Sequence, residues 1–142
     1  MGNGVWGKAI YSVVSKNTKA ISFVPRGELV EDFDVLVLCV PTQEIRNVIP
    51  LVLFGGKKKI IINTAKGIEQ KTHLLPHQIV SRLIKKPIEY YALLGPSFAK
   101  EVVDQMPTLV NLGYERKSKN VEIVRTLFQT PFFRVRPTHG IV

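Results

Sequence analysis

The stretch 35–40 constrains the fold of this chain more than any other, because it is almost continuously apolar. It is Val35-Leu36-Val37-Leu38-Cys39-Val40. An apolar run without the alternation of a half-exposed strand is typical of a parallel strand covered on both faces. Further apolar runs follow along the chain, with helical patterns between them. Strands separated by helices indicate crossover units and an α/β fold with a mostly parallel sheet.

The remaining elements follow from periodicity and from turn residues. We expect helices at 6–16, 42–54, 72–84, 97–104 and 120–129. We expect strands at 19–24, 35–40, 59–63, 90–94, 108–112 and 132–136. Thr42 is predicted to cap the helix that follows it. The 142 residues make one domain's worth of chain, 1–142, which is large enough to bury a core.

Charge and cysteine content narrow the class of function. The formal net charge is +9, from 20 basic and 11 acidic side chains, which suits either nucleic acid or phosphorylated small molecules. The basic residues are scattered with little aromatic interleaving, so we expect a phosphorylated small molecule and no nucleic acid. The single Cys39 excludes an internal disulfide, and the scattered His73, His77 and His139 give no metal-ligand spacing. No apolar run reaches bilayer length and no leader precedes the domain, so we expect a cytoplasmic protein without membrane insertion.

A glycine pattern at the start of the chain indicates a nucleotide site. Gly2, Gly4 and Gly7 have the Gly-x-Gly-x-x-Gly spacing in front of the first predicted helix. In that motif the first glycine makes a tight turn, the second lets the backbone approach a pyrophosphate, and the third lets helix and strand pack closely. The motif normally follows a strand, and here the chain starts one residue before it, so we expect that strand to be missing.

A second junction of strand and helix lies at Gly95-Pro96-Ser97, within residues 92–103. Backbone N–H groups at a helix start have no intrahelical partner and attract an anion or a polar cofactor edge. An alternative interpretation makes Ser97 an ordinary helix N-cap. Lys66 follows strand 59–63 at the carboxyl end of the sheet, where ligands of open α/β folds bind. The alternative interpretation is that Lys66 is a solvated lysine in a turn.

Several blocks in this order resemble the N-terminal domain of NAD(P)-dependent glycerol-3-phosphate dehydrogenase. They are residues 2–9, Val40-Pro41-Thr42-Gln43, Ala65-Lys66-Gly67-Ile68-Glu69, Gly95-Pro96-Ser97-Phe98-Ala99-Lys100-Glu101, Pro107-Thr108 and residues 127–135. The resemblance implies a Rossmann-like sheet with helices on both faces. It also implies oxidoreductase chemistry, in which hydride transfer interconverts sn-glycerol 3-phosphate and dihydroxyacetone phosphate for glycerophospholipid synthesis.

The resemblance also implies site residues. Those that contact the cofactor, NADP(H) or NAD(H), are Gly2, Gly4, Val5, Trp6, Gly7, Arg26, Lys66 and Ala99. Those that contact substrate are Lys66, Gly95 and Ser97. The loop that carries Gln43 and Arg46 lies along the dinucleotide in the family. Arg26 follows strand 19–24 where an arginine accommodates the 2′-phosphate of NADP(H), although Glu28, Glu31 and Asp32 argue against this and an ordinary surface arginine is the alternative.

The sequence departs from the family in three places. The strand before the glycine motif is missing, and so is one further strand between Arg26 and Val35. The helical C-terminal substrate domain, which carries the family's proton-transferring lysine, is absent, so no catalytic residue is assigned. We therefore expect an incomplete cofactor domain that is inactive alone. The alternative is a noncatalytic nucleotide-binding or interaction module, and copies of the chain are expected to associate as a homodimer or through exposed sheet edges.

Overall fold

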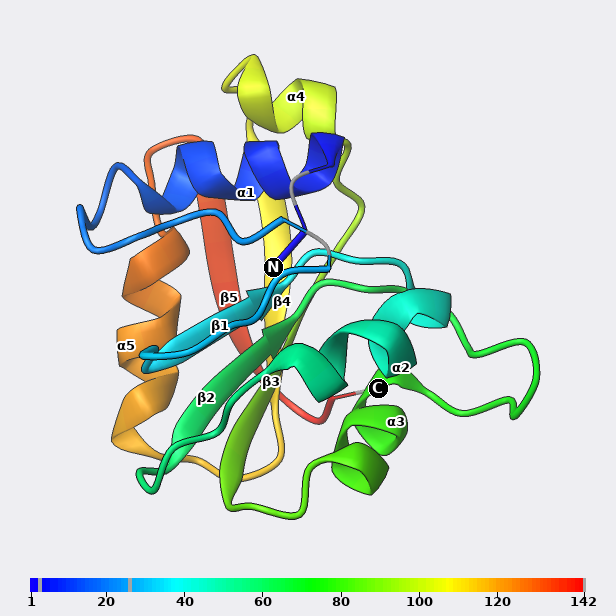
Figure 1. Ribbon diagram of the computed structural model, residues 1–142. Helices are drawn as coiled ribbons and strands as arrows, with labels where there is room; N and C mark the ends of the chain where they lie inside the picture. Colours follow the sequence, from blue (N-terminus) through cyan, green and yellow to red (C-terminus); the bar gives the residue numbers. More distant parts are fainter. Residues whose placement is uncertain (3, 26, 142) are drawn as a thin grey trace.

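The computed structural model describes residues 1–2, 4–25 and 27–141, which form one sheet flanked by helices (Figure 1). The strands are β1 (Val35–Leu38), β2 (Lys59–Asn63), β3 (Ile88–Leu94), β4 (Thr108–Tyr114) and β5 (Phe133–His139). They lie in the order β1-β2-β3-β4-β5. Only the β3–β4 pair in this sheet is antiparallel. The predicted α/β fold with a mostly parallel sheet is confirmed.

Helices cover both faces of the sheet, so each face has its own apolar core. One core lies under α1 (Val5–Val14), α4 (Ala99–Val103) and α5 (Lys119–Phe128), with Val13, Tyr91 and Val124 fully buried. The other lies under α2 (Ile45–Val48), α3 (Pro76–Leu83) and the 3₁₀ turns η1 (Thr42–Glu44) and η2 (Ile49–Leu51). In Figure 1 the strands run between α5 and α3. Among the described residues, every helix is too short or too polar to cross a membrane.

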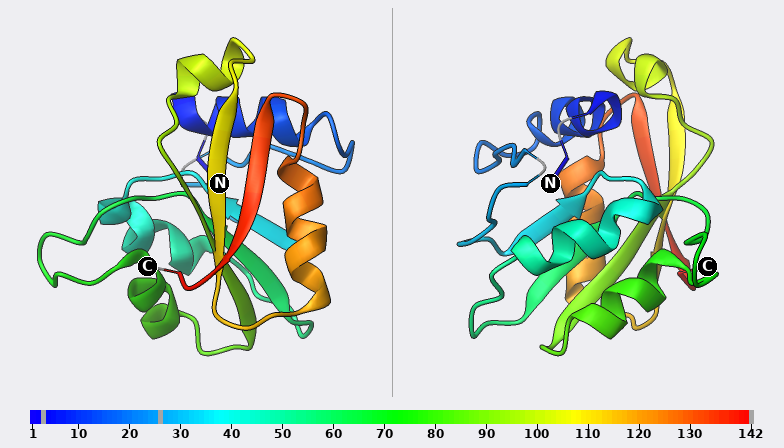
Figure 2. Two further views of the ribbon diagram at one scale, coloured as in Figure 1. Left: turned by 180° about the vertical axis from the view of Figure 1, so that it is seen from behind. Right: turned by 45° about the vertical axis from the view of Figure 1, so that its right-hand side comes forward.

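The connections between strands determine the strand directions. Those through α2, α3 and α5 return the chain to the start of the next strand, so the β1–β2, β2–β3 and β4–β5 pairs are parallel. After α4 the chain does not return, and β4 runs back beside β3 with Tyr91 opposite Tyr114. The carboxyl ends of β1, β2 and β3 consequently share one edge, which Figure 2 shows from two further sides.

The predicted strand at 19–24 is wrong. Residues 20–24 form neither a strand nor a helix, and the backbone bond they receive runs from the N–H of Gly2 to the carbonyl of Val24, at 3.1 Å. A parallel strand needs a neighbour that pairs along its length. The position between this segment and β1 holds only Met1 and Gly2, so one end of the segment is paired and the rest is not.

Three predicted helices are shorter than expected because of proline and local hydrogen bonds. The helix at 42–54 breaks into η1, α2 and η2, since Pro50 has no N–H to bond back into the turn before it. The helix at 72–84 begins only at Pro76, because the residue before a proline disfavours helical backbone and Leu75 is extended. The helix at 97–104 begins at Ala99.

Candidate functional site

Two of the glycines in the glycine loop, defined as residues 2–7, are required by close packing. Gly2 has a φ of +99°, and a Cβ there would lie 2.4 Å from the carbonyl oxygen of Cys39. A Cβ on Gly7 would lie 1.9 Å from the carbonyl oxygen of Gly2. Real side chains do not approach this closely, so neither position accepts a larger residue without movement of the loop. These contacts press the first turn of α1 against the end of β1.

Gly4 differs, because open space surrounds it. A Cβ there would have no heavy atom within 4 Å. Gly4 is also the N-cap of α1, and the first turn of this helix has neither a side-chain cap nor an acidic residue among the described residues. The free N–H groups and the positive end of the helix dipole therefore face an accessible region, which suits a phosphate. Val5, next along the helix, is 74% exposed.

Lys66 joins the glycine loop to the junction after β3. Its Nζ donates a hydrogen bond of 2.8 Å to the carbonyl oxygen of Gly95 and lies 5.9 Å from the centre of the Trp6 ring. The Ser97 hydroxyl donates to the same carbonyl at 3.4 Å. Four predicted site residues from three separate segments are thus close together, at the edge where the carboxyl ends of β2 and β3 lie. Lys66 forms no ion pair with a described residue, so its charge is available to an anionic ligand.

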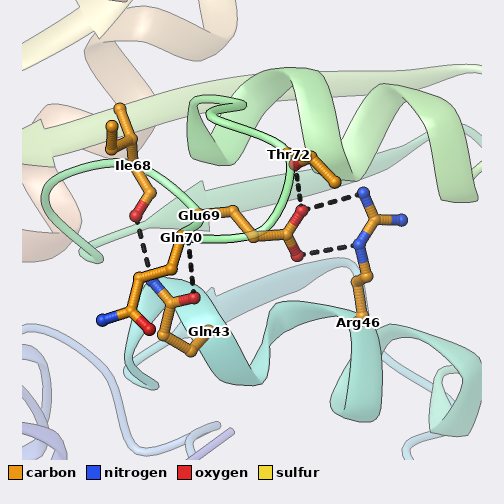
Figure 3. A network of polar contacts seen from close by, with 6 residues as sticks. All are labelled: Gln43, Arg46, Ile68, Glu69, Gln70 and Thr72. Carbon is orange, nitrogen blue, oxygen red and sulfur yellow. Dashed lines mark hydrogen bonds and ion pairs between the residues drawn. The ribbon is translucent and has the colours of Figure 1, made fainter.

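The loop that carries Lys66 is held by polar side chains of η1 and α2. We call residues 64–72 the lysine loop. Thr42 donates to the backbone carbonyl of Lys66 at 2.8 Å. The Gln43 amide donates to the carbonyl of Ile68 at 2.9 Å and accepts from the N–H of Gln70 at 3.0 Å (Figure 3). These bonds fix the backbone on both sides of Gly67.

A bidentate ion pair completes this network. Arg46 Nε and Nη2 lie 2.7 and 3.0 Å from the two carboxylate oxygens of Glu69, which also accepts a hydrogen bond from Thr72 (Figure 3). Glu69 is only 5% exposed. The hydrogen bonds from Arg46 and Thr72 lower the pKa of Glu69, and the same carboxylate raises the pKa of Arg46. In this structure Gln43 and Arg46 hold the lysine loop, a role that sequence reasoning missed.

The predicted cap at Thr42 is wrong, and so is the alternative interpretation of Ser97 as a cap. The N-cap of α4 is Phe98, without a side-chain cap bond, so Ser97 does not cap this helix. Its hydroxyl bonds within the turn instead, a local bond that competes with helix formation. Thr42 lies inside η1 after the N-cap Pro41, and its hydroxyl is used by the lysine loop.

The other predicted site residues have different positions. Ala99 begins α4 and packs, like Trp6, against the core under α1. Arg26 lies outside the described residues, so its predicted part in choosing between NADP(H) and NAD(H) stays a prediction. No group of three or more His, Cys, Asp or Glu side chains in the described part of the chain is arranged to hold a metal.

Two cavities lie away from Lys66. One of about 460 Å³ borders the glycine loop at Gly2 and Gly7 and continues between residues 20–24 and β1. Another of about 720 Å³ lies between η2, β2 and the end of α3, and no predicted site residue lines it. The predicted ligand surface is therefore open, along the edge between Gly4, Trp6, Lys66 and Gly95.

Comparison with known proteins gives the family. Residues 24–120 match the family described as NAD-dependent glycerol-3-phosphate dehydrogenase N-terminus. The chain belongs to this family. The matched residues include the lysine loop and the junction after β3, whereas the glycine loop lies before them.

Individual relatives agree with this assignment. The chain is 38% identical over 105 residues to glycerol-3-phosphate dehydrogenase (NAD(P)+) of Syntrophomonas wolfei, which covers 72% of this chain and 30% of that protein. It is 35% identical over 135 residues to the enzyme of the same name from Lawsonia intracellularis, covering 90% of this chain and 37% of that protein. The glycerol-3-phosphate dehydrogenase family member described here thus spans about a third of the length of these relatives.

Solved structures support the fold. The structure of Plasmodium falciparum glycerol-3-phosphate dehydrogenase superposes with a TM-score of 0.79 at 19% identity, covering 99% of this chain and 51% of that one. The Coxiella burnetii glycerol-3-phosphate dehydrogenase gives a TM-score of 0.69 at 21% identity, covering 96% and 52%. At these identities the likeness concerns the fold of the family's N-terminal domain.

Proposed function

We propose that this chain binds NAD(P)H across the carboxyl edge of its sheet, as the cofactor domain of a glycerol-3-phosphate dehydrogenase. The observation that carries the proposal is that the Lys66 ammonium group, bonded to the carbonyl of Gly95, lies over the ring of Trp6, which stands in the first turn of α1 next to the open N-cap Gly4. Glycine-rich helix starts at this edge bind dinucleotide phosphates in α/β folds.

The residues present fit such a cofactor. The first turn of α1 offers uncapped N–H groups to a pyrophosphate, and Gly4 leaves room for it. Lys66 uses one N–H on Gly95 and retains two donors for a phosphate or for a carbonyl oxygen that gains charge. The bound nicotinamide would supply or accept the hydride. Arg26 would favour NADPH over NADH.

The substrate belongs to the same proposal. By analogy with its relatives, the chain takes part in interconverting sn-glycerol 3-phosphate and dihydroxyacetone phosphate, with Lys66, Gly95 and Ser97 on the substrate side. Hydride transfer requires both reactants in near-attack geometry. Residues 1–142 correspond to about a third of the relatives, and the proton-transferring lysine belongs to a helical C-terminal domain in the family. We therefore expect cofactor binding without turnover from these residues alone.

A fluorescence titration tests the binding. Trp6 is the single tryptophan and lies beside Lys66, so its emission reports the site directly. We expect saturable quenching by NADPH and weaker binding of NADH. The variant Lys66→Met should weaken NADPH binding by about tenfold, because it removes a charged donor.

The matched control is Lys117→Met, which deletes an exposed lysine outside the site and should leave binding unchanged. A folded chain whose Trp6 emission responds to neither nucleotide would refute the proposed cofactor site. Equal losses in the two variants would show that only the overall charge matters. Oxidation of NADPH by the chain with dihydroxyacetone phosphate would contradict the expected inactivity.

A further inference from the structure

A group of lysines lies at the amino edge of the sheet, opposite the edge that carries Lys66. Two loops meet there: residues 54–58 lead into β2, and residues 84–87 lead into β3. In Figure 1 both loops lie at the lower end of the sheet, whereas α1 lies at its upper end. The Lys86 ammonium group donates a hydrogen bond to the carbonyl of Phe54, so the two loops are joined. The lysines in and beside these loops are Lys57, Lys58, Lys59, Lys85 and Lys86.

The two loops enclose a third, smaller cavity of about 240 Å³, which we call the amino-edge pocket. The residues that line it are Phe54, Gly55, Gly56, Lys57, Lys59, Lys86 and Pro87. Three of these seven are lysines and none is acidic, so the pocket concentrates positive charge. All of them lie within the two loops or at the start of β2, and neither end of the chain borders the pocket.

The three lysines of the pocket retain most of their charge and donors. Lys57 is exposed and forms no hydrogen bond or ion pair with a described residue. Lys86 uses one of its three N–H donors on the bond between the loops. Lys59 bonds to the carbonyl of Phe33 and lies 3.9 Å from the carboxylate of Asp34. That carboxylate is 95% exposed, and such a long, solvated pair is weak.

The glycines of the first loop add backbone donors. A Cβ on Gly55 or Gly56 would have no heavy atom within 4 Å, so open space lies beside this part of the loop. Among the described residues, no group accepts a hydrogen bond from the N–H of Gly55, Gly56 or Lys57. Lysine ammonium groups and successive free backbone N–H groups are the donors that bind phosphate in proteins. The pocket therefore has the chemistry of a phosphate site.

The cavity of about 720 Å³ adjoins the amino-edge pocket and has a different lining. Four residues line both, namely Phe54, Gly55, Lys59 and Lys86. The larger cavity adds apolar side chains, which are Ile49, Val52, Leu53, Leu83 and Ile84. It also adds Glu31 and Asp32, which do not line the amino-edge pocket. A ligand that spans both cavities is therefore favoured when it has one anionic end and an uncharged, apolar body.

We propose that the amino-edge pocket binds the phosphate group of a small phosphate monoester, whose apolar organic part occupies the adjoining larger cavity. The lysines and free N–H groups bind the phosphate, which carries close to two negative charges at neutral pH. The apolar side chains of the larger cavity cover the organic part. The site is separate from the proposed nucleotide site, since Trp6, Lys66 and Gly95 line neither cavity.

Isothermal titration calorimetry of the chain with monohexyl phosphate tests the proposal. We expect saturable binding that is about tenfold tighter than that of inorganic phosphate, because the hexyl group is buried. The second probe is 1,6-hexanediol bisphosphate, whose additional phosphate would lie near Glu31 and Asp32. We expect it to bind more weakly than monohexyl phosphate. Attraction by the net charge of +9 alone would give the reverse order.

Variants separate the two parts of the site. Lys57→Gln removes a charge that makes no bond within the described chain, and we expect both monohexyl phosphate and inorganic phosphate to bind about fivefold more weakly. Lys117→Gln removes an exposed lysine outside both cavities and is the matched control. Leu53→Asn changes a half-exposed apolar side chain and should weaken monohexyl phosphate alone. Lys66→Met should leave monohexyl phosphate binding unchanged.

Several outcomes would overturn the proposal. They are no binding of monohexyl phosphate at about 1 mM, tighter binding of the bisphosphate, equal losses in Lys57→Gln and Lys117→Gln, and loss of binding in Lys66→Met. Binding to vesicles that contain phosphatidic acid, without binding to monohexyl phosphate, would assign the lysines to a lipid surface and would also overturn it. Circular dichroism establishes that each variant is folded, and the comparison of the three phosphates needs only the unmodified chain. NADPH binding is measured separately, so each proposal fails on its own result.

Discussion

The two walls of the candidate site are built in different ways. The lysine loop is fixed by side chains, through Thr42, Gln43 and the Arg46–Glu69 ion pair. The glycine loop is fixed by backbone contacts of Met1 and Gly2 and borders the cavity of about 460 Å³ on one side. The first wall carries its own polar support, whereas the second depends on tight packing against β1. We therefore expect small changes in shape to damage the glycine loop more than losses of single polar groups damage the lysine loop.

The largest effect is expected from Gly7→Ala. The new Cβ would lie 1.9 Å from the carbonyl oxygen of Gly2, so α1 must move away from the loop. We expect a loss of about 3 kcal/mol in the free energy of unfolding, as for severe overpacking. Urea unfolding measures this change. The control Gly4→Ala has open space around it and should lose less than about 1 kcal/mol, so equal losses would contradict the proposed packing role of Gly7.

The next effect concerns the lysine loop. Glu69→Gln replaces a buried carboxylate that accepts both Arg46 donors. We expect a lower thermal midpoint and NADPH binding weakened by about fivefold, because Lys66 loses the support of its loop. Glu122→Gln removes an exposed ion pair with Arg125 on α5 and serves as the control. A thermal midpoint and affinity unchanged by Glu69→Gln would show that the ion pair does not position Lys66.

A low pH should weaken the lysine loop, as Glu69→Gln is expected to do. The pKa of Glu69 lies below its ordinary value of 4.5, because Arg46 and Thr72 bond to the ionised carboxylate. Its contribution to stability is present above the unfolded pKa and is lost as the pH falls through the folded pKa. We expect the urea midpoint to fall in this acid range, and to fall less steeply in Glu69→Gln. Equal slopes for both proteins would exclude Glu69 as a source of the acid sensitivity.

The smallest effect is expected from Ser97→Ala. The Ser97 hydroxyl makes one long bond of 3.4 Å to Gly95, does not cap α4, and lies in a half-exposed turn. We expect unchanged stability and less than about a twofold change in NADPH binding. Fluorescence titration of Trp6 provides the measurement. A tenfold loss of affinity would mean that Ser97 contacts the nucleotide directly.

Much of the fold could be predicted from local sequence. The strand 59–63 has the predicted bounds, because an apolar run ends in Asn63 and is preceded by lysines. The segment 19–24 has a strand-like sequence, yet pairing depends on a neighbour that its own residues do not specify. Pro50 and Pro76 shorten two of the predicted helices. This effect of proline can be read locally from the sequence, but the predicted bounds followed the apolar periodicity instead.

The site was predictable in its residue types and not in its contacts. The order of motifs brought Gly4, Lys66 and Gly95 to one edge of the sheet, as expected for carboxyl ends of parallel strands. The Arg46–Glu69 pair joins a residue of α2 to a residue of the lysine loop, and no spacing in the sequence indicates it. Opposite charges in the segments that follow the adjacent strands β1 and β2 were the available signal.

The bonds of Met1 to Val37 and Cys39 have a practical consequence for producing this protein. An affinity tag fused ahead of Met1 would start inside the sheet, between β1 and residues 20–24. Its last residues would be forced into strand geometry, and their sequence would influence folding yield, solubility and the position of Gly2. A tag at the carboxyl end avoids this interference, and preparations that differ only in where the tag is attached should behave as different proteins.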